Sequence, residues 1–195
     1  MVLRLAEVVG RDNILILLVL KNMEQRVVDK KQSLLKQTQK KLSDGKATNP
    51  INVFIESKNQ GGFETKIFIR EHELISDQPF GFTGQNRGPK PSELVLAALA
   101  ACQETTYRIF AEDMGIHIGK ISVQLKGTQD LRGFMAMDDE TPAGFANIVG
   151  QIFIQSDASE EELELLRQRV DRHCPVLDDL RRPVEVRLSL KKHSA

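Results

Sequence analysis

The chain has 195 residues, which suits a single large domain or one domain with an appendage. It is 41% hydrophobic and 28% charged, a composition that gives a globular protein enough apolar material for a core. Its 27 Lys and Arg residues balance 27 Asp and Glu residues, so no net charge attracts the whole molecule to nucleic acid or to an anionic membrane. We therefore expect neither as a partner.

Membrane insertion and secretion are not indicated either. The apolar run at residues 14–20 is seven residues long, whereas a spanning helix needs about 20. It lacks the basic leader and the small-residue cleavage site of a secretory signal, so we expect a cytoplasmic protein. In that compartment a cysteine pair is more often catalytic, metal-binding or redox-sensing than a structural disulfide. The four histidines show no ligand spacing, so we expect no metal and no other cofactor.

Residues 13–42 predict one long helix with a narrow, discontinuous apolar stripe. Residues 21–46 hold eight Lys and Arg residues against three Asp and Glu residues, a net charge of +5. This basic face either contacts an acidic partner or lipid, or is solvated while the stripe docks elsewhere. We favour a solvated face, because the stripe is too narrow for a membrane anchor. The polar stretch 43–50 predicts a linker, which divides the chain into a helical extension, 1–48, and a domain, 49–195.

The domain begins with β signals. The stretches INVFIE and FETKIFIR alternate around the turn KNQGG, which predicts a hairpin over 51–70 with a loop of about five residues. HELIS, at 72–76, is short enough to add a third strand. The Gly- and Pro-rich stretch 77–91 predicts a loop, and Ser92 after it is the expected N-cap of a helix over 92–113.

The second half of the domain repeats the alternation of strands and a helix. HIGKISVQL, NIVGQIFIQ and VEVRLSL predict three strands. Before the last of them, residues 159–174 predict a helix that starts with a capping box of Ser159 and Glu162 and that Pro175 helps to end. The order β-β-β-α-β-β-α-β indicates an α+β fold with a largely antiparallel sheet.

Each of the two cysteines lies on the expected buried stripe of a predicted helix. Cys102 shares a helical face with Leu99, and Cys174 follows Val170 by four residues. If the two helices pack together, the thiols are neighbours although they are 72 positions apart. Buried cysteines are most often inert core residues. However, His173 beside the second cysteine, and the Phe-bearing loop that leads into the helix of the first, favour a reactive site.

A reactive thiol at Cys102 needs help from other residues. At an ordinary pKa of about 8.5, only ~3% of a thiol is ionised at neutral pH. Lowering the pKa alone gains little, because nucleophilicity falls with it. A fast peroxidase therefore also needs a cation or hydrogen-bond donors that stabilise the departing oxygen. The helix dipole cannot act at a mid-helix position, so Lys58, Arg70 and Arg87 remain as candidate cations.

Three motifs together resemble the OsmC/Ohr family of thiol peroxidases, the osmotically inducible protein C and organic hydroperoxide resistance proteins. They are GQNRGPKPSELVLAALAACQ at the loop-to-helix junction, HELISDQP before it, and HCPV after the second helix. The resemblance covers about residues 50–192 and leaves the helix over 13–42 outside.

The resemblance implies an intertwined homodimer in which two central helices pack on sheets from both subunits, with active sites at the interface. It also implies that Cys102 attacks an organic hydroperoxide and becomes a sulfenic acid. Cys174 then condenses with that acid to a disulfide and releases water, and a dithiol reductant restores both thiols.

The sequence departs from the family at the residues that hold the thiolate, an arginine in the first hairpin and a glutamate just before the cysteine helix. The hairpin turn here offers only Lys58, and the place of the glutamate, ten residues before the cysteine, holds Ser92. Glu93 lies about 180° around the helix from Cys102. We therefore carry over the cysteines and leave the activating residues open.

Two other functions stay open. A non-catalytic binding protein or redox sensor on the same fold would use the apolar interface pocket for a lipid-like ligand, and the missing Arg/Glu pair favours it. An adaptor would act through the basic helix over 13–42. The peroxidase is the leading hypothesis.

Overall fold

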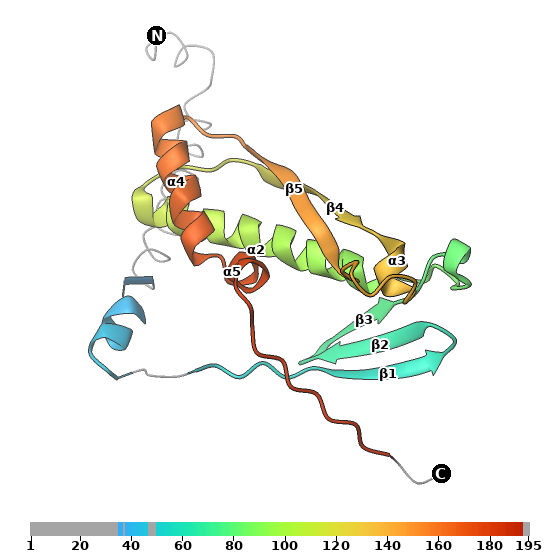
Figure 1. The fold of residues 1–195 in the computed structure, drawn as a ribbon. Helices are drawn as coiled ribbons and strands as arrows, with labels where there is room; N and C mark the ends of the chain where they lie inside the picture. Colours follow the sequence, from blue (N-terminus) through green and yellow to red (C-terminus); the bar gives the residue numbers. More distant parts are fainter. Residues whose placement is uncertain (1–34, 37, 47–49, 193–195) are drawn as a thin grey trace, which may run out of the picture. The chain divides into compact units, whose positions relative to one another are not determined.

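The computed structural model describes residues 35, 36, 38–46 and 50–192 (Figure 1). Residues 35, 36 and 38–43 are helical, while the rest of the helix expected over 13–42 and the boundary expected at 48 lie outside the described residues. The described residues fall into two units. The first ends at Ile51 and includes Glu112–Gly115; the second holds all other described residues, including both cysteines.

The second unit starts with a three-stranded antiparallel sheet in the order β1-β2-β3. The strands are β1 Glu56–Gly61, β2 Glu64–Ile69 and β3 His72–Ser76. The third strand is confirmed, but the first lies further along the chain than predicted: residues 51–55 form no strand. Residues 58–61 of the stretch expected as a five-residue loop belong to β1, and the turn is made by residues 62 and 63. Gly61 and Gly62, at φ of 110° and 53°, adopt the left-handed backbone that this tight turn requires.

Helix α2, Pro91–Met114, follows the loop and is 24 residues long. Its N-terminus differs from the prediction, because it begins at Pro91 and Ser92 is already helical. Proline suits the first helical position, where no amide hydrogen is needed. Glu93 Oε2 accepts a hydrogen bond from the Lys90 backbone N–H at 3.0 Å, so this side chain caps the helix start.

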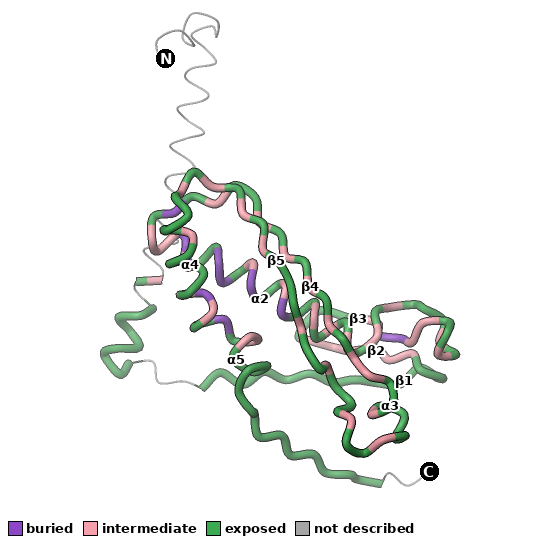
Figure 2. Tube along the Cα trace, turned by 45° about the horizontal axis from the view of Figure 1, so that its top comes forward, coloured by how far each residue is buried: buried purple, intermediate pink, exposed green. Residues whose placement is uncertain are grey.

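A two-stranded antiparallel ladder joins β4, Ile121–Gln129, to β5, Phe145–Ile154. Every second residue of β4 is partly covered, and the covered apolar side chains face those of β5 in register, for example Val123 opposite Ile152. The ladder runs alongside α2 in both views (Figures 1 and 2). Between the strands lies a short helix, α3 Leu131–Phe134, which the sequence did not predict.

Helix α4, Glu160–His173, has the predicted capping box. Ser159 Oγ accepts from the backbone N–H of Glu162, and the Glu162 side chain accepts from the backbone N–H of Ser159. Pro175 ends this helix but also begins another, α5 Pro175–Arg181, because proline at a first helical position starts a helix as readily as it stops one. The sequence interpretation missed this second role.

The strand predicted for VEVRLSL is absent: residues 183–192 form no helix or strand. Alternate side chains there are apolar and exposed, with Leu188 at 94% and Leu190 at 99% exposure. A β-strand needs a neighbour for its backbone hydrogen bonds, and this segment pairs with no described strand of its own chain. The segment therefore has the alternating side chains of a strand but no backbone pairing among the described strands.

The core of this unit lies where α2 meets α4 (Figure 2). On α2 the buried row runs through Leu99, Gln103, Tyr107 and Ala111, each four residues from the next; on α4 it runs through Leu166 and Val170 to Cys174. Rows of this spacing interdigitate when two helices pack. The two cysteines are therefore brought together by ordinary helix packing.

Candidate active site

The structure places the two sulfur atoms in direct contact. Cys102 Sγ and Cys174 Sγ lie 3.1 Å apart, and both cysteines are free. A disulfide bond is about 2.05 Å long, so a movement of about 1 Å would join them. Two thiols at this distance can be oxidised to a disulfide without rearrangement of the helices that carry them.

Cys174 occupies the junction of α4 and α5. It is fully buried, its backbone N–H donates to Val170 O at 2.9 Å, and its carbonyl accepts from Asp178 N at 3.0 Å. It thus ends one helix and begins the next, which fixes its backbone on both sides. Burial raises the pKa of the Cys174 thiol, the hydrogen bond with Cys102 raises it further, and a hydrogen bond from the Thr106 side chain acts in the opposite direction. Cys174 is held as a thiol.

Cys102 lies at the edge of the buried row of α2 and is half-buried. One helical turn further on, Thr106 Oγ1 lies 4.0 Å from Cys102 Sγ and donates to the Cys102 carbonyl at 2.7 Å. Of the two residues, Cys102 is the partly exposed one and Cys174 is the fully buried one. This asymmetry suits an attacking thiol and a resolving thiol.

Aromatic contacts join the same two helices. The rings of Phe110 and His173 have centroids 5.3 Å apart, and the Arg169 guanidinium lies 4.7 Å from the centre of the Phe110 ring. The sequence interpretation singled out His173 as a neighbour of Cys174. Its ring packs on Phe110, which with Arg169 forms a wall beside the helix contact.

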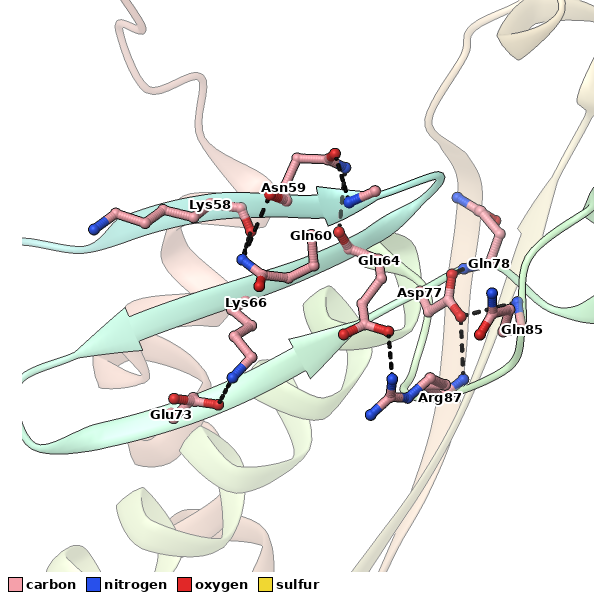
Figure 3. Close-up of polar contacts among 11 residues, drawn as sticks. Lys58, Asn59, Gln60, Glu64, Lys66, Glu73, Asp77, Gln78, Gln85 and Arg87 are labelled. Carbon is pink, nitrogen blue, oxygen red and sulfur yellow. Dashed lines mark hydrogen bonds and ion pairs between the residues drawn. The ribbon is translucent and has the colours of Figure 1, made fainter.

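The loop that leads into α2 is built around one carboxylate. Asp77, which is only 2% exposed, accepts backbone hydrogen bonds from Gln78, Gln85 and Arg87 at 2.7, 2.9 and 3.2 Å (Figure 3). Burial alone would raise the pKa of this carboxyl, but the three N–H donors and the Arg87 charge together lower it below its ordinary value. The loop is closed at its base by Ser76 Oγ, which donates to Pro89 O at 2.9 Å.

The same loop directs Arg87 to the sheet. Arg87 Nη1 lies 3.1 Å from Glu64 Oε2 on β2 (Figure 3), and the Glu64 side chain is only 15% exposed. Lys58 lies 3.4 Å from Glu56, with its ammonium 5.6 Å from the centre of the Phe68 ring. Arg70 occupies the β2–β3 turn at a φ of 52°. Two of the three candidate cations are thus held in ion pairs on the three-stranded sheet.

Helix geometry separates the loop from the sulfur of the same protomer. Cys102 follows the first residue of α2 by eleven positions, which corresponds to a rise of about 16 Å. The cation that a peroxidase needs is therefore not delivered to Cys102 by the start of its own helix. The structure brings the two predicted cysteines together and does not bring the predicted cations to them.

Several residues that shape the site were not predicted. Thr106, Asp77 and Glu64 are short-range or cross-strand partners of residues that were identified. The spacing of Cys102 and Thr106, four residues apart on one helix, places both on one face but assigns Thr106 no role. The pairing of Glu64 with Arg87 depends on how the loop folds over the sheet, and no sequence periodicity carries that information.

Neither a metal cluster nor a membrane span is found in the described part of the chain. No group of three or more metal-ligating side chains occurs among the described residues. No described helix is long and apolar enough to cross a membrane. An open groove of about 530 Å³ lies at the end of the β4–β5 ladder beside Arg108, and its lining contains neither cysteine. The apolar cleft expected around Cys102 is not this groove.

Comparisons with known proteins identify the fold. The structure is similar to that of an OsmC like protein from Mycoplasma pneumoniae, with a TM-score of 0.60 and 21% identity over 68% of this chain and 89% of that chain. It is also similar to an organic hydroperoxide resistance protein OsmC from Legionella pneumophila, with a TM-score of 0.54 and 17% identity over 69% of this chain and 92% of that chain. An organic hydroperoxide resistance protein from Elizabethkingia anophelis gives a TM-score of 0.53 and 17% identity over 71% and 94% of the two chains.

At these identities the solved structures establish the fold alone. No curated protein matches the sequence. The family model described as OsmC-like protein matches residues 84–189, a segment that is more than half of the chain and that contains both cysteines. The α+β fold and the resemblance read from the three motifs are confirmed, and the chain belongs to the OsmC-like family.

Proposed function

We propose that this protein is a two-cysteine peroxidase that reduces organic hydroperoxides. The observation that supports this function best is the 3.1 Å separation of the Cys102 and Cys174 sulfur atoms, at a contact that seals one thiol and leaves the other accessible. A pair of core cysteines with only a packing role needs no such contact or asymmetry.

The reaction requires three balanced steps. The Cys102 thiolate attacks the terminal oxygen of the hydroperoxide, the O–O bond breaks, and a sulfenic acid and an alcohol form after the alkoxide takes a proton. The Cys174 sulfur then attacks Cys102 Sγ, the S–O bond breaks, and a disulfide and water form. An external dithiol finally reduces the disulfide to the two thiols and is itself oxidised.

The apolar character of the helix that carries Cys102 favours an organic peroxide over hydrogen peroxide. Near the cysteine, α2 is built from alanines and leucines, with Leu99 buried and Val95 and Ile109 at 38% and 41% exposure. The free energy of binding becomes more favourable when an alkyl or aryl group leaves water for such a surface. Hydrogen peroxide has no apolar group and obtains no such contribution.

We propose further that the active form is a homodimer. Large apolar side chains are exposed along two extended segments, 51–55 and 184–190, that pair with no described strand of their own chain. A second copy is the occupant that the family fold supports. It would also bring a loop with its Arg87, and the Glu64 of β2 that pairs with it, to the Cys102 of the first copy, since the helix rise separates the start of α2 from Cys102 in one chain.

Peroxide turnover tests the function directly. Purified protein with dithiothreitol should consume cumene hydroperoxide, hydrogen peroxide more slowly, and Cys102→Ser should consume neither above background. Thr105→Ser, which changes an exposed hydroxyl residue on the same helix, is the matched control and should retain full turnover. Equal consumption by the wild type and Cys102→Ser would refute the proposal.

The second candidate is a non-catalytic binding protein or redox sensor on the same fold. The observation that favours it is the engagement of Lys58 and Arg87 in ion pairs on the sheet rather than beside the sulfurs. Native mass spectrometry of gently purified protein distinguishes the two functions. A retained apolar ligand together with slow thiol oxidation supports binding, and a ligand-free protein with fast oxidation supports the peroxidase.

A further inference from the structure

A groove of about 530 Å³ lies between α2 and the end of the β4–β5 ladder. Its lining comes from α2, from the start of β4 and from the end of β5: Arg108, residues 119–122 and residues 153–155. Hydrogen bonds continue the ladder to this end, since Gly119 N–H donates to Gln155 O and Gln155 N–H donates to Lys120 O, each at 2.8 Å. The walls are therefore ordered, and the volume is that of a small-molecule site.

The groove is lined by two cations and by no carboxylate. The cations are Arg108 and Lys120, and the other lining residues are uncharged. Among the described residues, neither cation has a carboxylate partner, in contrast to Arg87, which pairs with Glu64. Guanidinium and ammonium groups bind carboxylates and other anions through charge-assisted hydrogen bonds. A chain whose charges balance overall thus presents a local positive charge at this groove, which favours an anionic ligand.

The groove also offers apolar surface beside these cations. Phe153 is 47% exposed and lies opposite Ser122 in register, on the face of the ladder whose other side chains are mostly polar. The paired residues Ile121 and Ile154 add aliphatic surface to the lining. An exposed phenyl ring favours offset stacking with a second ring, a contact that an inorganic anion cannot make. The ligand that uses both halves of the lining is an anion that carries an aromatic group.

The groove is separate from the sulfur pair, because its lining contains neither cysteine. Arg108 follows Cys102 by six positions on α2. Six positions correspond to a rise of about 9 Å and to a rotation of about 120° around the helix axis. A ligand held at Arg108 therefore contacts a different face of α2 from the one that carries the thiol.

We propose that this groove is a binding site for an aromatic carboxylate, with the carboxylate at Arg108 and Lys120 and the ring on Phe153. The Ser122 hydroxyl and the Gln155 amide line the same groove and offer further hydrogen-bond donors to the carboxylate. The site goes beyond the proposed peroxidase function and does not depend on it, since it involves no thiol and no redox step.

A titration of the full chain with naphthoate, followed by two-dimensional amide NMR, tests the site. The amides of residues 119–122 and 153–155 should shift, with a Kd of about 0.1–1 mM, as expected for a ligand of this size. Naphthamide has nearly the same shape and no charge, so it should bind at least about tenfold more weakly. Inorganic phosphate, which has no ring, should also bind more weakly than naphthoate.

Matched variants assign the binding to the groove. Arg108→Gln and Lys120→Gln should each weaken naphthoate binding about fivefold, the upper end for an exposed charge pair. Lys126→Gln removes an exposed cation of β4 outside the lining and should leave the Kd unchanged. Phe153→Ala should weaken binding about fivefold through the lost ring contact. Val149→Ala, at a 58% exposed position of β5 outside the lining, should not.

Three results would overturn the proposal. The first is equal affinity for naphthoate and naphthamide, or an unchanged Kd when Arg108 and Lys120 are both replaced by glutamine. The second is phosphate that shifts the same amides as tightly as naphthoate, which would show an adventitious ion only. The third is a set of shifts confined to the surroundings of Cys102. Cys102→Ser should bind naphthoate as the wild type does although it lacks peroxide turnover, so either proposal can fail without the other.

Discussion

The middle and the start of α2 are organised in different ways. Around Cys102 the helix packs on α4, and the contacts are made by buried side chains of one chain, with the sulfur pair at their edge. At the start of the helix the chain is a loop held by backbone hydrogen bonds to Asp77, and its cation is paired with Glu64 on the sheet. The middle of the helix carries the sulfur pair, and its start carries charge without a reactive group beside it.

This difference separates two requirements of peroxidase chemistry. The thiol couple depends on helix packing within the protomer, so changes to the core should act on it through stability and sulfur separation. The proposed activating charge, that of Arg87, depends on where the loop is positioned. Changes to the loop should therefore slow the first oxidation step and leave disulfide formation unaffected. The following variants test that separation, from the largest expected effect to the smallest.

Removal of Cys174, the proposed resolving thiol, should have the largest effect. Cys174→Ser keeps Cys102 and should still consume one equivalent of hydroperoxide, but turnover with dithiothreitol near the protein concentration should fall about 100-fold or more, because only the dilute external thiol can then condense with the sulfenic acid. Adducts of Cys102 with a sulfenic-acid trap, quantified by mass spectrometry, should accumulate in this variant and not in the wild type. Unchanged turnover in Cys174→Ser would show that the sulfur contact is only structural.

A cavity in the helix contact should cost the most stability. Leu166 is fully buried on α4, so Leu166→Ala should lower the free energy of unfolding by about 3 kcal/mol, measured by urea denaturation. Leu165, the adjacent residue, is 58% exposed, and Leu165→Ala should cost less than about 1 kcal/mol. Similar losses at both positions would mean that the α2–α4 contact is not the core of this unit.

The stability of the loop should depend on pH through the carboxylate of Asp77. Because its pKa in the folded state lies below the ordinary value of 3.8, the carboxylate stabilises the loop fully above that pH, and the contribution is lost as the pH falls below it. Asp77→Asn should lower the melting temperature at neutral pH, and its difference from the wild type should shrink on acidification below pH 3.8.

Hydrogen exchange gives the local readout for that variant. The amides of Gln85 and Arg87 should exchange faster in Asp77→Asn, while those of α4 are unchanged. Asp139→Asn, at an exposed position, is the control and should change neither the melting temperature nor the exchange of the loop. If the difference in melting temperature between Asp77→Asn and the wild type does not change with pH, the charge of Asp77 does not stabilise the loop.

The smallest effect is expected at the capping box of α4. Ser159→Ala removes the acceptor of the Glu162 N–H and should cost about 1 kcal/mol in urea denaturation, whereas Ser159→Thr keeps the acceptor and should cost much less. The disulfide rate should be unaffected in both, because Cys174 lies at the other end of the helix. A large loss of disulfide rate in Ser159→Ala would show that the whole helix positions the thiol.

The sequence predicted the features that depend on local pattern. Three features could be predicted in this way: the capping box of Ser159 and Glu162, the long helix of Cys102, and the alternation in β4 and β5. In each case residues at a fixed short spacing share a face, three or four positions apart in a helix and two apart in a strand. The contact of the cysteines was expected only on condition that their helices pack, and no periodicity could establish that condition. The family resemblance added the thiol chemistry, which periodicity does not encode.

The features that were predicted wrongly depend either on a tertiary contact or on a residue type that has two structural roles. The segment predicted as the last strand alternates as expected, but Leu188 and Leu190 lie next to no described strand that pairs with them. Pro175 was interpreted as a stop, although a proline starts a helix equally well. Ser92 was expected as an N-cap, but the helix begins one residue earlier with Pro91. The pairing of Arg87 with Glu64 joins a loop to a strand and follows from tertiary structure alone.

Peptide mapping of the oxidised protein tests the central claim most directly. Reduced wild-type protein is treated with one equivalent of cumene hydroperoxide, blocked with an alkylating reagent and digested without reductant. The account predicts one cross-linked pair of peptides, joining Cys102 to Cys174, with no alkylated cysteine left in that fraction. Two alkylated cysteines, or an oxidised Cys102 beside an unreacted Cys174, would contradict it.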